Sequence, residues 1–259
     1  MENASAIFYS DQSITGKRKK EELLAHEIAH QWFGNSATET DWPHVWLSEG
    51  FATSMANLYL EHRYGQDTLT SILKDDRREI IEFSRKRFTP IVDTSERNDL
   101  FTLLNVNSYQ KGGWVLHMLR RKLGDSLFRK CISAYYNAFA GKNASTDDLR
   151  KVVEHVSGME QNIFFEQWLF TAGHPVLDMS WKYNDNKKEI AITITQKQKS
   201  IFSFSLELLL GKMESVAPIT ILVNKKLTEV KLPLSSKPSE VIADPNTSLL
   251  FEGSIIETR

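Results

Sequence analysis

The clearest chemical feature of this chain is a pair of histidines four residues apart, with a glutamate between them. His26, Glu27 and His30 form the pattern His-Glu-x-x-His. On a helix, positions i and i+4 lie on one face, so both imidazoles can reach a single metal ion at about 2.0–2.1 Å. A carboxylate beside the first histidine can take a proton from a metal-bound water. The pattern therefore predicts a zinc-dependent hydrolase.

A third ligand is offered by Glu49, which follows His30 after eighteen intervening residues. Two histidines and one carboxylate leave the fourth position around zinc open to water or substrate, as in catalytic rather than structural sites. Water bound there would titrate near pH ~7. We therefore expect one Zn²⁺ per chain, held by His26, His30 and Glu49. Glu27 would be the catalytic base for the zinc-activated water and would later return the proton to the leaving nitrogen.

Two predicted helices must position these side chains. Residues 21–34 carry apolar residues at helical spacing, and Gly34 is a helix stop signal. A second helical pattern covers residues 48–65 and places Glu49 in its first turn. The loop between them, which includes Pro43, can fold that turn back over the histidine pair. The competing interpretation is an ordinary solvated or half-buried helix, whose histidines make only hydrogen bonds.

Longer segments around these residues resemble a known family. Residues 26–35 (HEIAHQWFGN) and residues 46–52 (WLSEGFA) are similar to the zinc aminopeptidases related to aminopeptidase N and leukotriene hydrolase. These enzymes are gluzincins, named for the glutamate that is the third zinc ligand, and Glu49 occupies that position here. The resemblance implies an aminopeptidase that acts on peptide substrates with a free N-terminus.

Two further segments carry the resemblance and add two site residues. Residues 109–112 (YQKG) resemble the family's Tyr-x-Lys-Gly segment, whose tyrosine hydroxyl stabilises the tetrahedral oxyanion. Residues 1–3 (MEN) resemble the end of its Gly-x-Met-Glu-Asn motif, whose glutamate holds the substrate's α-amino group. The resemblance thus implies that Tyr109 is catalytic and that Glu2 binds substrate. A core aromatic and an unremarkable exposed carboxylate are the alternative interpretations of these two residues.

Members of this family carry a long strand-rich domain, and several strands of the catalytic lobe, before the Met-Glu-Asn segment. The resemblance therefore implies that this chain is a C-terminal part that lacks the N-terminal domain. The helix bearing His26 would then expose an apolar face that the absent strands normally cover. Such a face is a partner surface or an aggregation liability.

The hydrophobic period changes once along the chain. Residues 21–171 are almost entirely helical in pattern, whereas alternating runs typical of strands follow residues 173–175 (GHP). We predict an α+β fold. Residues 1–175 would form a mostly helical, thermolysin-like catalytic lobe that is N-terminally truncated, and residues 176–259 a small antiparallel β-sandwich domain.

Composition excludes some classes of function. The hydrophobic fraction of 41% and charged fraction of 25% are those of a globular protein, and a net charge of −1 gives no reason to expect nucleic acid or a membrane surface as partner. No apolar stretch approaches the ~20 residues that span a bilayer. The localisation is left open.

Two hypotheses from different classes follow. The first is a zinc aminopeptidase that hydrolyses the N-terminal peptide bond of peptides through a zinc-activated water. The alternative is a catalytically incompetent fragment or interaction module that retains a zinc site. Another zinc hydrolase, including an epoxide hydrolase like one branch of the resembling family, is a third possibility without a feature of its own.

Overall fold

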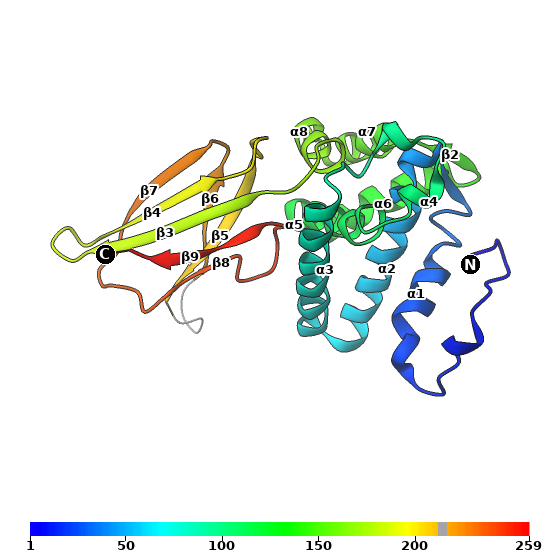
Figure 1. Ribbon diagram of the computed structural model, residues 1–259, viewed down its shortest axis with the longest axis horizontal. Helices are drawn as coiled ribbons and strands as arrows, with labels where there is room; N and C mark the ends of the chain where they lie inside the picture. Colours follow the sequence, from blue (N-terminus) through cyan, green and yellow to red (C-terminus); the bar gives the residue numbers. More distant parts are fainter. Residues whose placement is uncertain (212–216, 259) are drawn as a thin grey trace. The chain divides into compact units, whose positions relative to one another are not determined.

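The computed structural model describes residues 1–211 and 217–258. The chain divides into two compact units, Met1–Gly173 and His174–Arg259. The first unit is mainly helical and the second is built from strands (Figure 1). This division of secondary structure confirms the predicted α+β class. The thermolysin-like and β-sandwich descriptions, and the domain assignment built on them, stay predictions.

The first unit is built around α-helices. These are α1 (Glu21–Ala29), α2 (Trp46–Tyr64), α3 (Gln66–Lys86), α4 (Leu100–Leu103), α5 (Gly112–Leu123), α6 (Asp125–Phe139), α7 (Thr146–Ser157) and α8 (Asn162–Phe165). Short 3₁₀ turns are η1 (Asp11–Ser13), η2 (Arg18–Lys20), η3 (Trp42–His44) and η4 (Thr94–Glu96), and π-helical turns are η5 (Asn107–Lys111) and η6 (Glu166–Phe170). Strands β1 (Ala37–Glu39) and β2 (Lys142–Ala144) pair in parallel. Among the described residues, no helix is both long and apolar enough to cross a bilayer.

Helix α1 ends at Ala29, earlier than the predicted stop at Gly34. The turn that follows is tighter than an α-helical turn, because the Gln31 N–H bonds to the carbonyl three residues earlier at 3.1 Å. His30 nevertheless keeps helical backbone dihedrals, and its N–H bonds to the His26 carbonyl at 3.3 Å. The two histidines therefore stay one helical turn apart.

Helix α2 is the central element of the first unit and packs against α1, α3 and α5. It begins at Trp46 and carries Glu49 in its first turn, as predicted. Phe51, in its second turn, is fully buried. The Phe51 ring stacks on Phe33 and on Tyr135 of α6, with ring centroids 4.5 and 5.5 Å apart. These aromatic contacts fix the turn that follows α1 against α2 and α6.

Helices α2 and α5 approach each other through two glycines. A Cβ atom built on Gly50 would lie 3.0 Å from both the Cα and the carbonyl carbon of Gly112. A Cβ built on Gly112 would lie 3.0 Å from the Cα of Gly50. Glu49 precedes the first glycine, and the turn η5 precedes the second. The close crossing therefore brings the first turn of α2 against η5.

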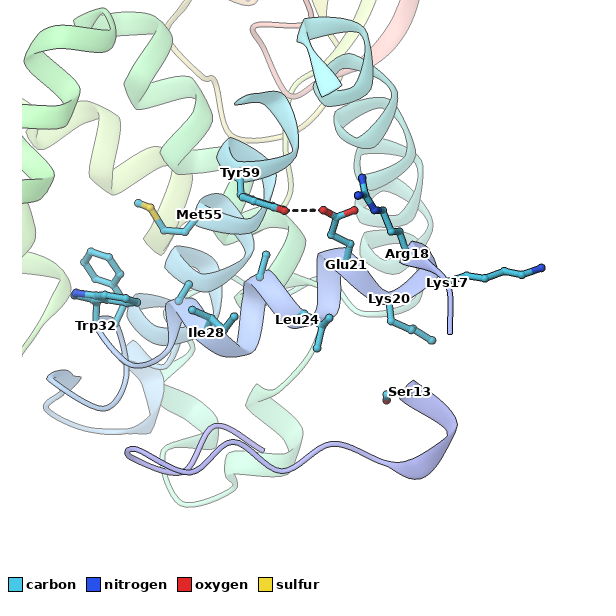
Figure 2. Close-up of a pocket in the computed structure, with 13 residues that line it drawn as sticks. Ser13, Lys17, Arg18, Lys20, Glu21, Leu24, Ile28, Trp32, Met55 and Tyr59 are labelled. Carbon is cyan, nitrogen blue, oxygen red and sulfur yellow. Dashed lines mark hydrogen bonds between the residues drawn. The ribbon is translucent and has the colours of Figure 1, made fainter. Parts of the chain in front are cut away.

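One face of α1 is apolar and exposed, as expected from the resemblance. Leu24 and Ile28 of α1, and Trp32 in the turn that follows it, are 42%, 48% and 49% exposed. With Met55 and Tyr59 of α2 they line an open groove of about 720 Å³ (Figure 2). The apolar surface of the histidine-bearing helix is thus divided between the contact with α2 and this groove.

The second unit contains two sheets among the described residues. Its strands are β3 (Val176–Asn184), β4 (Glu189–Gln196), β5 (Phe204–Leu210), β6 (Ile219–Val223), β7 (Leu227–Pro233), β8 (Val241–Ala243) and β9 (Glu252–Glu257). One sheet has the order β7-β4-β3-β9 and the other has the order β6-β5-β8. Ile190, Ile192 and Ile194 of β4 are all buried, which confirms the alternation predicted for this segment.

Strand β9 departs from the prediction of an antiparallel domain. It pairs in parallel with β3, with Val176 opposite Glu252, whereas the other strand pairs described in this unit are antiparallel. Most residues of β9 are exposed or half-buried on both faces. A strand with no buried face has no period-two hydrophobic pattern, so this edge strand could not be recognised from its residue pattern.

The close crossing at Gly50 and Gly112 predicts that replacing Gly50 by alanine lowers stability, whereas this replacement in a helix usually raises it. Replacing glycine by alanine inside a helix normally stabilises a protein by about 1 kcal/mol. In Gly50→Ala the new methyl group would press on the backbone of Gly112, and overpacking of this kind costs about 1–3 kcal/mol. We expect urea denaturation to give a lower free energy of unfolding for Gly50→Ala than for the wild type. A variant that is as stable as the wild type, or more stable, would contradict the close crossing.

Candidate metal centre

The three predicted ligands lie together at the contact between α1 and α2. The Nε2 atoms of His26 and His30 are 3.0 Å apart, and each lies 3.2 Å from Oε2 of Glu49. Ligand atoms placed tetrahedrally at 2.0–2.1 Å from zinc are separated by about 3.3 Å. The three atoms are therefore already spaced for one ion. Among the described residues, no other group of three His, Cys, Asp or Glu side chains converges in this way.

The environment of His30 selects the tautomer that a metal needs. The His30 ring is buried, and its Nδ1 lies 3.1 Å from the carbonyl oxygen of Phe33. A carbonyl oxygen only accepts hydrogen bonds, so Nδ1 carries the proton and donates it. Nε2 is then left with a lone pair that faces His26 and Glu49. This is the arrangement in which a second hydrogen bond orients a histidine ligand.

Charges inside the cluster compensate one another. Burial by itself would raise the pKa of Glu49, but the hydrogen bonds and positive charges of His26 and His30 in their protonated forms together outweigh burial and lower that pKa to about 2. Burial likewise disfavours the charged form of His30, yet the hydrogen bond and charge of Glu49 leave its pKa raised. A metal ion bound here would compete with protons for the same three atoms, so its binding would weaken in acid.

Tyr109 lies beside these ligands. Its ring stacks on the ring of His26, with centroids 5.9 Å apart and planes 15° from parallel. Burial, followed by the negative charges of Glu49, Glu2 and Glu27, raises the pKa of Tyr109 far above its ordinary value. The phenol therefore keeps its proton, and its hydroxyl acts as a hydrogen-bond donor beside the ligands.

The turn that carries Tyr109 is not an ordinary α-helical turn. Tyr109 lies in the π-helical turn η5, and the α-helix proper begins at Gly112. The turn is anchored at both ends: the Asn107 amide donates to the Thr89 carbonyl at 3.0 Å, and Lys111 Nζ donates to the Gly173 carbonyl at 2.8 Å. These bonds reach distant segments, so helical propensity alone does not reveal the π-helical turn.

Glu27 and Glu2 also lie at this site. The Glu27 side chain is 13% exposed, and its Oε2 is 3.2 Å from the terminal nitrogen of Met1. The Glu2 carbonyl accepts hydrogen bonds from the side chains of Asn35 and Gln31, the latter at 3.4 Å. No motif in the sequence indicates a role for these two amides, although they lie in the segment that follows His30. They hold residues 1–3 beside the end of α1.

The structure therefore gathers all six predicted site residues into one region. Their roles remain predictions, because geometry places side chains without showing what they bind. A cluster of carboxylates beside a donor phenol and two imidazoles can hold a divalent cation, transfer a proton and attract an ammonium group. Each of these three functions would use different side chains of the site.

Comparisons with known proteins agree with this arrangement. Residues 1–168 match the model described as peptidase family M1 domain. Aminopeptidase M1-C of Oryza sativa subsp. japonica is 34% identical over 195 residues, which cover 71% of this chain and 21% of the relative. Tricorn protease-interacting factor F2 of Thermoplasma volcanium is 33% identical over 236 residues, covering 87% of this chain and 29% of the relative. This chain thus spans well under half the length of these relatives.

A solved structure gives a likeness of fold. The crystal structure of Legionella pneumophila aminopeptidase A in complex with aspartic acid superimposes with a TM-score of 0.71 at 19% sequence identity. The match covers 92% of this chain and 27% of that chain. At this level of identity the likeness concerns the fold alone.

Lys111, which is buried in the same turn as Tyr109, predicts that the free energy of unfolding depends on pH in alkaline solution. Burial lowers the pKa of Lys111 from 10.5 to about 8, so between these values the unfolded chain binds more protons than the folded one. The contribution of Lys111 to the free energy of unfolding must then rise with pH across this window, by up to about 3 kcal/mol.

The measurement is urea denaturation of the wild type and Lys111→Met at several pH values. We expect the wild type to gain stability relative to Lys111→Met between pH 8 and pH 10.5. Lys74→Met removes an exposed lysine of α3 and controls for the loss of a surface charge. A difference between wild type and Lys111→Met that stays constant across the window would contradict a buried ammonium group.

Proposed function

Because this chain belongs to peptidase family M1, we propose that it is a zinc-dependent aminopeptidase that hydrolyses the N-terminal peptide bond of peptides. The observation that carries the proposal is the convergence of His26, His30 and Glu49 on one point between α1 and α2. The names of its relatives, which include aminopeptidases from a plant, support the same activity. In this proposal Met1–Gly173 is the thermolysin-like catalytic lobe, and the strands that follow form a β-sandwich domain.

The donor set supports zinc as the metal. His26, His30 and Glu49 would hold the ion, because two imidazoles and one carboxylate form a three-ligand set with an open position, as in catalytic zinc sites. A bound Zn²⁺ supplies Lewis acidity, lowering the pKa of water to about 7 and polarising a carbonyl group. The Nδ1 hydrogen bond of His30 to a backbone carbonyl keeps its Nε2 free for this role.

Three other side chains supply the remaining chemistry. Glu27, next to a ligand and largely shielded from solvent, takes a proton on its carboxylate and returns it to the leaving nitrogen. Tyr109 keeps its phenolic proton and donates a hydrogen bond to the oxygen on which negative charge develops. Glu2 binds the ammonium group of the substrate, which restricts cleavage to the first peptide bond.

A non-catalytic module that retains zinc is the second candidate function. The observation that favours it is the exposed apolar groove along α1, since such grooves serve as protein-binding surfaces. The two candidates share the metal site and differ in turnover. They can therefore be separated by measuring metal content and activity on the same sample.

The purified chain should contain one zinc ion and should cleave aminoacyl chromophores that have a free amino group, but not their N-blocked analogues. Glu27→Gln should keep the zinc and lose turnover by about 10²–10⁴-fold, because the amide cannot accept the proton. Glu22→Gln, at an exposed position of the same helix, is the matched control and should behave as the wild type.

Two results would count against this proposal. A zinc-loaded wild type that cleaves no free-amine substrate would support the non-catalytic module. Full activity in Glu27→Gln would remove this residue from its role as base, and equal cleavage of blocked substrates would remove Glu2 from amine binding.

Removing the phenolic hydroxyl should act on turnover rather than on substrate binding. Tyr109→Phe keeps the ring that stacks on His26 and loses only the hydrogen-bond donor. We expect steady-state kinetics to show kcat reduced by about 10²–10³-fold with KM little changed, as for the loss of an oxyanion donor. Tyr59→Phe, which removes a surface hydrogen bond to Glu21, is the control. A raised KM with an unchanged kcat would assign Tyr109 to substrate binding instead.

A further inference from the structure

A second buried carboxylate lies next to the ligand cluster and has no part in the chemistry proposed above. Glu39 is the last residue of β1 and is only 8% exposed. Its Oε2 accepts a hydrogen bond from Oγ of Ser48 at 2.5 Å. Ser48 is itself buried and immediately precedes Glu49. No lysine, arginine or histidine among the described residues forms an ion pair with Glu39, so Ser48 is its close polar side-chain contact.

Glu39 is held in place by elements other than α1 and α2. Strand β1 pairs with β2 so that Glu39 stands opposite Ala144. Its carbonyl oxygen also accepts a hydrogen bond from the side-chain amide of Asn143 at 2.9 Å. The carboxylate of Glu39 is therefore presented from a backbone that is bonded on one side to β2 and on the other to the turn that follows α1, where the Ala37 N–H donates to the Trp32 carbonyl at 2.9 Å.

Ser48 lies where the two ligand-bearing segments meet. A Cβ atom built on Gly34 would lie 3.1 Å from Nδ1 of His30 and 3.3 Å from Oγ of Ser48. Only a residue without a side chain fits between the histidine ring and the serine hydroxyl, and Gly34 also has a φ of +121°. One junction thus contains the ring of a ligand, the turn after α1 and the first turn of α2.

No side chain caps the first turn of α2. The residue before the helix, Val45, has no polar side chain, and only its carbonyl accepts hydrogen bonds from the N–H groups of Ser48 and Glu49, at 2.9 and 3.0 Å. Serine caps are the usual way to fix such a turn. Here the Ser48 hydroxyl instead bonds outward to a buried carboxylate, and hydrogen bonds to carboxylates are shorter and stronger than those between neutral groups.

We propose that Glu39 is a positioning residue of the metal centre, which acts through Ser48 to set the direction of the Glu49 carboxylate. This inference rests on the proposed zinc site, and it goes beyond the six residues predicted from the sequence. Replacing a residue that hydrogen-bonds to a metal ligand and orients it commonly lowers metal affinity by about 10–100-fold. The acceptor oxygen of Glu39 is the feature that matters, so an amide in its place should serve.

The test measures zinc affinity by competition with a chromogenic chelator. We expect Glu39→Leu and Ser48→Ala each to weaken zinc binding by about 10-fold, and the double variant to bind no more weakly than either single variant. Glu39→Gln should stay within about 3-fold of the wild type, because its amide oxygen still accepts the Ser48 hydrogen bond. With Co²⁺ in place of zinc, Glu39→Leu should shift the visible absorption bands, whereas Glu39→Gln should leave them unchanged.

A matched control is available elsewhere in the same unit. The Ser95 hydroxyl donates to the buried carboxylate of Asp93 at 2.5 Å, and neither residue belongs to the ligand cluster. Ser95→Ala removes a bond of the same kind and should leave zinc affinity unchanged. If Glu39→Leu fails to fold, Ser48→Ala and Glu39→Gln decide the question by themselves.

Two outcomes would overturn the role of Glu39. In the first, the variants lower the thermal stability of the metal-free chain and leave zinc affinity at the wild-type value, as expected of a residue that supports only the fold. In the second, the two single effects multiply in the double variant, so the residues act separately. These results leave the proposed enzyme intact, whereas a folded wild type that binds no zinc overturns the metal site and Glu39 together.

Discussion

Glu49 is a buried carboxylate held between two imidazoles, and the site is organised around it. Its burial would favour the neutral acid, yet His26 and His30 keep it ionised, with a pKa of about 2. That compensation depends on contact among the three groups, whose Nε2 and Oε2 atoms lie 3.0–3.2 Å apart, and so on the way α1 packs against α2. The stacking of Phe33 on Phe51 holds the two helices in this arrangement, because it joins the turn after α1 to α2.

The same packing brings the second half of the site into place. The crossing of α2 and α5 at Gly50 sets the turn η5 against the first turn of α2, so Tyr109 lies on His26. Lys111 then ties this turn to the carbonyl of Gly173 at the end of the first unit. Burying the charged Lys111 ammonium group costs free energy. Its hydrogen bond nevertheless fixes the backbone of the turn η5, which sets the direction of the Tyr109 phenol. The proposed chemistry depends on these contacts as much as on the ligands.

Local patterns in the sequence were sufficient to predict that three side chains converge between α1 and α2, and to predict the secondary-structure class. His26 and His30 are related by helical spacing, and Glu49 by its place in the next helix, so short-range rules apply to all three. What the sequence missed depends on contacts between distant residues. The π-helical turn at Tyr109 and the bond between Glu39 and Ser48 arise from tertiary packing, and the edge strand β9 has no buried face to mark it. No periodic signal encodes such features.

The most direct test of the account is X-ray absorption spectroscopy of the zinc-loaded chain at the zinc edge. Zinc held by His26, His30 and Glu49 should give a shell of nitrogen and oxygen atoms at about 2.0–2.1 Å, with the outer-shell scattering of two imidazoles and no sulfur. His30→Ala should remove one imidazole from that shell. A shell of oxygen atoms alone, or a spectrum unchanged in His30→Ala, would show that zinc binds elsewhere and would contradict the central claim.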